Sequence, residues 1–124
     1  LPMPVSGRIV GRFGKAFDPE SKLQIFKKGI EISTPQVTPV KAIYPGKIAY
    51  SGELQNYGRV VIVDHGDHFY SLCARLGSLK KNAGDEVKVG DSIGTSDPAG
   101  KPLYFEIRAK NIPVDPLAWV AKTN

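Results

Sequence analysis

A strict alternation of apolar and polar residues occupies residues 103–108. The apolar positions are Leu103, Phe105 and Ile107, and the polar positions are Tyr104, Glu106 and Arg108. A β-strand points successive side chains to opposite faces, so this spacing places one set in a core and the other in a groove or in solvent. The segment is therefore predicted to be a strand whose two faces have different tasks.

Other segments carry strand signals, and residues typical of turns separate them. The predicted extended segments are residues 4–13, 26–32, 40–44, 48–50, 59–63 and 69–76. Residues 15–21 and 51–56 are predicted to be loops, residues 77–81 a connector, and residues 115–120 one helical turn that packs Trp119 on the core. No segment keeps a helical period over the roughly 10 to 12 residues that indicate a long helix. The predicted fold is all-β.

The composition indicates one folded domain. A chain of 124 residues with 41% hydrophobic content is long enough to bury a core. Its 13 glycines and 10 prolines are spread along the chain, which favours many short strands and turns over disorder. No apolar run approaches the roughly 20 residues of a membrane span, and no signal peptide is visible. We expect residues 1–124 to be a single domain without a transmembrane segment, the C-terminal part of a longer protein.

The charge balance favours an acidic partner without identifying it. The formal net charge is +5 and the pI is about 9.4, which suits nucleic acid, anionic wall polymers, anionic lipid or an acidic protein surface. The sequence has no arginine-rich helix, zinc finger or RNP-type aromatic signature, so nucleic acid is not predicted as a partner. The single cysteine, Cys73, lies in an apolar segment and is predicted to be a small core residue.

The residues that bind metals are scarce. A catalytic zinc ion needs about three protein ligands, from His, Cys, Asp or Glu, with one open position for water. The chain has two histidines, His65 and His68. Their spacing points them to opposite faces of an extended segment, although a turn at residues 66–67 could bring them together. We interpret them as a turn histidine beside an exposed one, with no metal site.

The segment 101–108, Lys-Pro-Leu-Tyr-Phe-Glu-Ile-Arg, strongly resembles the last motif of the LytM/lysostaphin-type zinc endopeptidases, His-x-His-Phe-Glu-Ile. Pro102 and Tyr104 stand at its two histidine positions. The resemblance covers nearly the whole chain, including Asn56-Tyr57-Gly58-Arg59-Val60-Val61-Ile62 and the closing Val114-Asp115-Pro116-Leu117. It implies a compact antiparallel β-sheet sandwich of the LytM, or duplicated hybrid motif, type, with β-hairpins and a short C-terminal helical turn.

The other two motifs of the family also lack their histidines. The first metal motif, His-x-Gly-x-Asp, aligns with residues 27–31, so Lys27 replaces the histidine and Glu31 the aspartate. The Tyr-x-His-Leu motif aligns with residues 73–76, which places Arg75 at a catalytic histidine position. An ammonium group has no lone pair for zinc and repels the cation, but Lys27 could pair with Glu31. The resemblance therefore implies a degenerate peptidase without catalytic residues, bound metal or other cofactor.

The chain is most similar to the EnvC-like activators of cell-wall amidases. In that family picture, the domain binds an N-acetylmuramoyl-L-alanine amidase, and its metal-free groove accommodates the amidase's autoinhibitory helix. The resemblance thus implies an amidase as protein partner, a role in cell-wall splitting and cell division, and a periplasmic or other extracytoplasmic location. The residues expected to form the partner-binding groove are Lys27, Lys28, Glu31, Tyr57, Arg75, Tyr104 and Arg108, with Glu106 as an alternative to Arg108.

Three alternatives remain open at this point. The domain could be a module that binds peptidoglycan directly, through its glycan or its stem peptide. It could be a scaffold domain that docks a partner in an envelope complex. It could also be an active peptidase with unusual ligands. The sequence does not identify the partner amidase, the upstream domains or the oligomeric state.

Overall fold

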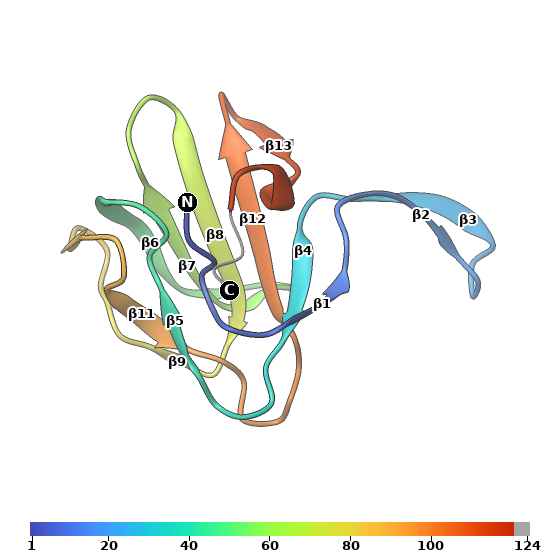
Figure 1. The fold of residues 1–124 in the computed structure, drawn as a ribbon, viewed down its shortest axis with the longest axis horizontal. Coiled ribbons are helices and arrows are strands. Elements are labelled where there is room, and N and C mark those ends of the chain that lie inside the picture. The colour runs from blue at the N-terminus through green and yellow to red at the C-terminus, as the bar shows by residue number, and fades with distance from the viewer. Residues whose placement is uncertain (121–124) are drawn as a thin grey trace.

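The structure, a computed structural model, describes residues 1–120 and is built almost entirely from strands (Figure 1). The strands are β1 (Arg8–Gly11), β2 (Gly14–Asp18), β3 (Leu23–Lys27), β4 (Ile30–Ser33), β5 (Pro39–Lys41), β6 (Gly46–Leu54), β7 (Gly58–Asp64), β8 (Phe69–Leu76), β9 (Ser78–Leu79), β10 (Glu86–Val87), β11 (Ser92–Thr95), β12 (Leu103–Ala109) and β13 (Ile112–Val114). A 3-10 helix, η1 (Pro116–Ala118), follows them. The predicted all-β fold with a short C-terminal helical turn is confirmed.

The strands form three antiparallel sheets. The largest has eight strands in the order β1-β4-β12-β8-β7-β6-β10, with β13 pairing β12 outside this path. A second sheet has the order β5-β11-β9. The third is the hairpin of β2 and β3, which extends away from the other strands at the right of Figure 1. Among residues 1–120, no helix has the length and hydrophobicity that a membrane crossing requires.

Strand β12 lies inside the large sheet and carries the predicted alternation. It pairs with β4 on one side and with β8 on the other. Leu103, Phe105 and Ile107 are at most 1% exposed and belong to the core, as predicted. The side chains of the intervening residues lie on the opposite face of the sheet. That second face holds the candidate site.

The core around β12 also contains the chain's single thiol. Cys73 is buried on β8, opposite Phe105, and the prediction that it is a core residue is confirmed. Burial raises the pKa of Cys73 to about 12, because the thiolate would lose its hydration in the apolar interior.

Two predicted loops are wrong. Residues 15–21 contain most of β2, which pairs with β3. Neither face of this strand is buried in a core. Its sequence therefore lacks the alternation of apolar and polar residues that predicts a strand, and only the residues typical of the turn could be recognised. Residues 51–56 contain the end of β6, which stays paired with β7 as far as Leu54. A shift of register between Ile48 and Tyr50 precedes this part of β6, in which no residue is buried. The connector at 77–81 likewise includes the two-residue strand β9.

The end of the described chain packs as one short turn. Asp115 accepts a hydrogen bond from the Leu117 backbone N–H at 3.0 Å, which caps η1. Trp119 stacks on Phe69 with a centroid distance of 5.4 Å, yet 42% of Trp119 remains exposed. Pro116 and Val120 are the buried residues of this segment. Trp119 thus covers the edge of the core rather than entering it.

Candidate functional site

Six of the seven predicted groove residues line one pocket of about 440 Å³, called here the basic pocket. Its lining consists of Phe26, Lys27, Lys28, Gly29, Glu31, Asn56, Tyr57, Arg75 and Tyr104. These residues come from the end of β3, from β4, from the turn between β6 and β7, and from β8 and β12. Segments far apart in the sequence therefore meet in one pocket.

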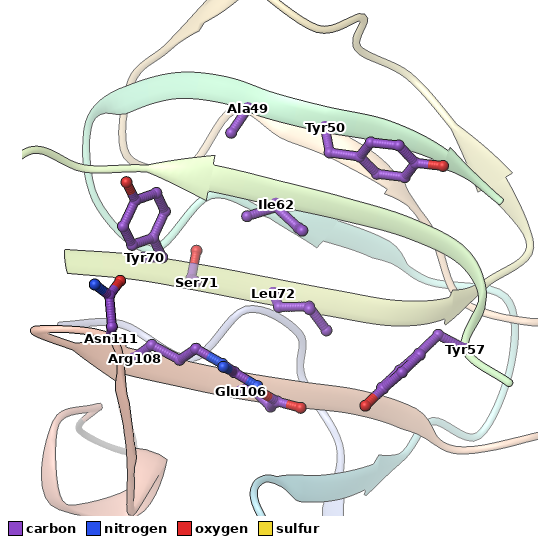
Figure 2. Close-up of a pocket in the computed structure, with 10 residues that line it drawn as sticks. All are labelled: Ala49, Tyr50, Tyr57, Ile62, Tyr70, Ser71, Leu72, Glu106, Arg108 and Asn111. Atoms are coloured by element: carbon purple, nitrogen blue, oxygen red, sulfur yellow. The ribbon is translucent and has the colours of Figure 1, made fainter. Parts of the chain in front are cut away.

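The seventh predicted residue, Arg108, lies in a neighbouring pocket of about 520 Å³, called here the tyrosine pocket (Figure 2). Its lining consists of Ala49, Tyr50, Tyr57, Ile62, Tyr70, Ser71, Leu72, Glu106, Arg108 and Asn111. Tyr57 borders both pockets. We refer to the two pockets together as the groove.

Strand pairing explains why these side chains meet. Tyr104 on β12 pairs with Glu31 on β4 and with Ala74 on β8. Gly29 allows the segment before β4 to approach β12 closely. A Cβ atom at Gly29 would lie 2.5 Å from the Phe105 carbonyl oxygen and 3.0 Å from Cζ of Tyr104. Any larger residue would force β12 and the segment before β4 apart.

Glu31 is held by two cations. Its Oε2 accepts a hydrogen bond from Nη1 of Arg75 at 2.9 Å, and its Oε1 lies 4.0 Å from Nζ of Lys27. The predicted pairing of Lys27 with Glu31 is present, but Arg75 is the closer partner. Arg75 has a left-handed backbone, with φ of 60°, and its N–H donates to the Tyr57 carbonyl at 2.9 Å. This irregular point of β8 orients the Arg75 side chain.

Tyr104 connects the two halves of the groove. The guanidinium carbon of Arg75 lies 5.5 Å from the Tyr104 ring centroid, within the range of a cation–π contact. The Tyr57 ring lies 5.9 Å from the Tyr104 ring, centroid to centroid. The Tyr104 hydroxyl donates to Oε2 of Glu106 at 2.6 Å. Burial, reinforced by this bond to a carboxylate, raises the pKa of Tyr104, so its side chain is a neutral phenol at physiological pH.

Glu106 is the residue whose role the sequence did not reveal. It is only 1% exposed, and its carboxylate accepts hydrogen bonds from the Tyr104 hydroxyl and from Nε of Arg108, the latter at 3.0 Å. Figure 2 shows Glu106 beside Arg108 on β12. A buried carboxylate needs such partners, because an unpaired buried charge is costly. Glu106 therefore fixes the two side chains on either side of it. The shared strand face of residues 104, 106 and 108 was the signal for this arrangement.

The basic pocket does not fit a zinc ion. Lys27 and Arg75 are cations without a free lone pair, and the Tyr104 hydroxyl is a protonated donor to Glu106. Glu31 is the one lining residue with a side chain of a usual zinc ligand type, and it is already paired with Arg75. Within residues 1–120, no three His, Cys, Asp or Glu side chains are grouped closely enough to hold a metal ion.

The two histidines lie elsewhere and differ in environment. His65 is partly buried, with Nδ1 3.0 Å from the Pro45 carbonyl and Nε2 2.8 Å from the Ser71 hydroxyl. His68 is exposed. Burial lowers the pKa of His65, because the imidazolium would lose hydration.

Acidification is expected to destabilise the protein through His65. In the folded state His65 takes up its proton at lower pH than in the unfolded state, so the stability it contributes is complete above about pH 6.5 and is lost as pH falls through the folded pKa. Urea unfolding at about pH 7.5 and about pH 5 should show a smaller loss for His65→Gln than for the wild type. His68→Gln is the control and should keep the wild-type pH dependence. An equal loss in the wild type and His65→Gln would contradict this role.

Several known proteins resemble this chain in sequence. The sequence model of peptidase family M23 matches residues 25–116. The murein hydrolase activator EnvC of Escherichia coli is 36% identical over 123 residues, which is 96% of this chain and 28% of the relative. A Pseudomonas aeruginosa protein named as a lipoprotein NlpD/LppB homolog is 34% identical over 96% of this chain and 39% of its own length. The chain spans between 20% and 44% of the length of the first relatives that it matches.

Solved structures show the same fold. A zinc-containing peptidase from Vibrio cholerae superimposes with a TM-score of 0.81 over 91% of this chain and 37% of its own, at 24% sequence identity. That peptidase contains zinc, whereas the residues lining the basic pocket of this chain do not provide a zinc donor set. The scaffold is therefore shared, while the lining of the site differs from what zinc requires. Since the family model covers most of its length, the chain belongs to peptidase family M23, the LytM-type domains.

Proposed function

We propose that this domain is a non-catalytic activator that binds a peptidoglycan N-acetylmuramoyl-L-alanine amidase and accommodates the amidase's autoinhibitory helix in the groove. The observation that carries the proposal is the lining of the basic pocket. Two cations, Lys27 and Arg75, line this pocket together with Tyr104, at the positions that the resemblance assigns to histidines, and Glu31 pairs with Arg75 instead of sharing a metal with them. The similarity to a relative named as a murein hydrolase activator supports the same assignment.

The groove has the chemistry of a protein-binding surface. The basic pocket contains three cationic side chains and one carboxylate, so an acidic segment is its complementary ligand. Tyrosine and arginine are the residue types that most often carry binding energy at interfaces, and Tyr57, Tyr104 and Arg108 lie along the groove. Because Glu106 already fixes Tyr104 and Arg108, little of their side-chain freedom is lost on binding.

Activation then follows from differential affinity. An amidase whose helix can block its own active site exists in closed and open states. The domain binds only when the helix is free, so binding shifts the population towards the open state. Each difference of about 1.4 kcal/mol between the two affinities changes the open fraction tenfold. No bond is made or broken by the domain itself.

The proposed location is the periplasm or another extracytoplasmic part of the cell envelope. A relative that matches most of this chain is named as a lipoprotein, and another is named for murein hydrolase activation. Peptidoglycan lies in this compartment, where an activator would meet both the amidase and its substrate.

Dye release from labelled sacculi tests the proposal. Sacculi are incubated with the domain, with the amidase of the same organism, and with both. The combination should release dye many times faster than the amidase alone, and the domain alone should release none. Release by the domain alone would instead indicate peptidase activity. Sedimentation of the domain with purified sacculi, combined with no effect on the amidase, would favour a peptidoglycan-binding module.

A further inference from the structure

The β2–β3 hairpin carries large apolar side chains that the rest of the described chain does not cover. Phe17 and Leu23 are each 62% exposed, Phe26 is 56% exposed and Ile25 is 41% exposed. The two strands pair only with each other. An isolated two-stranded hairpin is marginally stable in water, so exposed apolar residues on one indicate a contact that is absent from the free domain.

The register of the hairpin assigns these residues to two faces. Phe17 is opposite Gln24, and Phe26 is opposite Lys15. Opposed residues share a face and successive residues alternate, so Phe17 and Phe26 lie on one face at diagonal positions, which we call the aromatic face. By the same alternation Leu23 and Ile25 lie on the other face, which we call the aliphatic face.

The aromatic face is continuous with the groove. Phe26 lines the basic pocket beside Lys27 and Lys28. Its ring also contacts Phe13 edge-on, with centroids 5.2 Å apart, and Phe13 packs against the core. This contact anchors Phe26 at the base of the hairpin, and Phe17 extends the apolar surface outwards from the basic pocket.

We propose that the aromatic face of the hairpin binds the apolar side of the same amidase helix whose acidic side faces the basic pocket. The inference rests on the proposed function and specifies the ligand. The helix is amphipathic, with carboxylates towards Lys27, Lys28 and Arg75 and apolar residues towards Phe17 and Phe26. Five strand residues at about 3.3 Å each span roughly 17 Å, which corresponds to about 11 helical residues at 1.5 Å rise.

A lipid surface fits this hairpin poorly. Its outer turn contains Asp18 and Glu20, which would have to enter the bilayer first if the hairpin inserted. The Asp18 carboxylate accepts hydrogen bonds from the Ser21 hydroxyl at 2.8 Å and from the Glu20 N–H at 3.1 Å. These bonds lower the pKa of Asp18 and keep it charged. With two carboxylates against one lysine, Lys22, the turn also offers no net attraction to anionic headgroups.

The test compares two residues of equal exposure on opposite faces. A fluorescein-labelled synthetic peptide of the amidase's autoinhibitory helix is titrated with the wild-type chain, Phe17→Gln and Leu23→Gln, and binding is followed by anisotropy. Phe17→Gln should weaken binding about tenfold, whereas Leu23→Gln should change it less than twofold. With p-benzoylphenylalanine in place of Phe17, illumination should crosslink the chain to the peptide, and the same group in place of Leu23 should not.

The outcomes separate this inference from the proposed function. If the wild type activates the amidase and Tyr104→Ala does not, but Phe17→Gln and Leu23→Gln bind the peptide equally, the hairpin inference is wrong and the groove proposal stands. If the wild type neither binds the peptide nor activates the amidase, both are wrong. Sedimentation with phosphatidylethanolamine–phosphatidylglycerol vesicles that is lost in Phe17→Gln, without a change in peptide binding, would also overturn the inference.

Discussion

Replacing Tyr104 with alanine is expected to abolish amidase activation while leaving the domain folded. The ring contacts both Tyr57 and Arg75, and its hydroxyl bonds Glu106, so its removal takes away the centre of the groove. A central interface tyrosine is typically worth about 2 kcal/mol or more, which is roughly a 30-fold loss of affinity. Arg108→Ala should act in the same direction. Dye release with either variant should fall to the rate of the amidase alone.

A second tyrosine provides the control for this prediction. Tyr44 is 47% exposed and contacts His65 and Phe69, away from the groove. Tyr44→Ala should activate as the wild type does. Tyr104→Phe keeps the ring but loses the bond to Glu106, so it should retain part of the activation. Full activation by both Tyr104→Ala and Arg108→Ala, at concentrations that do not saturate the amidase, would remove the groove from the mechanism.

Phe105→Ala is expected to have the opposite outcome, a large loss of stability. Phe105 is completely buried between Ile30 of β4 and Cys73 of β8. Truncating a buried phenylalanine typically costs about 3–5 kcal/mol, because the cavity is only partly filled by its neighbours. A domain of this size is stabilised by about 5–15 kcal/mol in total, so the variant should be close to unfolding.

Equilibrium urea unfolding measures this loss. Phe17→Ala is the matched control, because Phe17 is 62% exposed and its truncation should change the free energy of unfolding by less than about 0.5 kcal/mol. A midpoint for Phe105→Ala equal to that of Phe17→Ala would mean that β12 does not organise the core. The pair Tyr104 and Phe105 would thus separate activity from stability on adjacent residues of one strand.

The sequence predicted most of the strands that are buried on one face or both, but not the short strands β10 and β11. The alternation on β12 predicted its faces correctly because Leu103, Phe105 and Ile107 all enter the core. The hairpin strand β2 was missed, since Phe17 and its neighbours face no core and give no burial pattern. The second half of β6 was missed because none of its residues is buried, and a register shift between Ile48 and Tyr50 precedes it. Periodicity reports burial, and it fails where a strand is exposed or bulged.

The position of the site could be predicted, but its internal contacts could not. The resemblance to the LytM motifs brought together Lys27, Glu31, Arg75 and Tyr104, which the structure places in one pocket. The motifs did not reveal that Arg75 is closer to Glu31 than Lys27 is, because this depends on the left-handed backbone of Arg75. Nor did the motifs reveal that Glu106 is buried and accepts hydrogen bonds from Tyr104 and Arg108. That these residues bind the partner stays a prediction.

Because Cys73 is buried in the core, the rate at which its thiol reacts can be used to measure how often the fold opens. A thiol reacts as the thiolate, and burial opposite Phe105 both suppresses that form and blocks the approach of a reagent. Alkylation at neutral pH therefore requires a transient opening in which β8 and β12 separate. Its rate records how often the domain's centre comes apart, without any label being introduced.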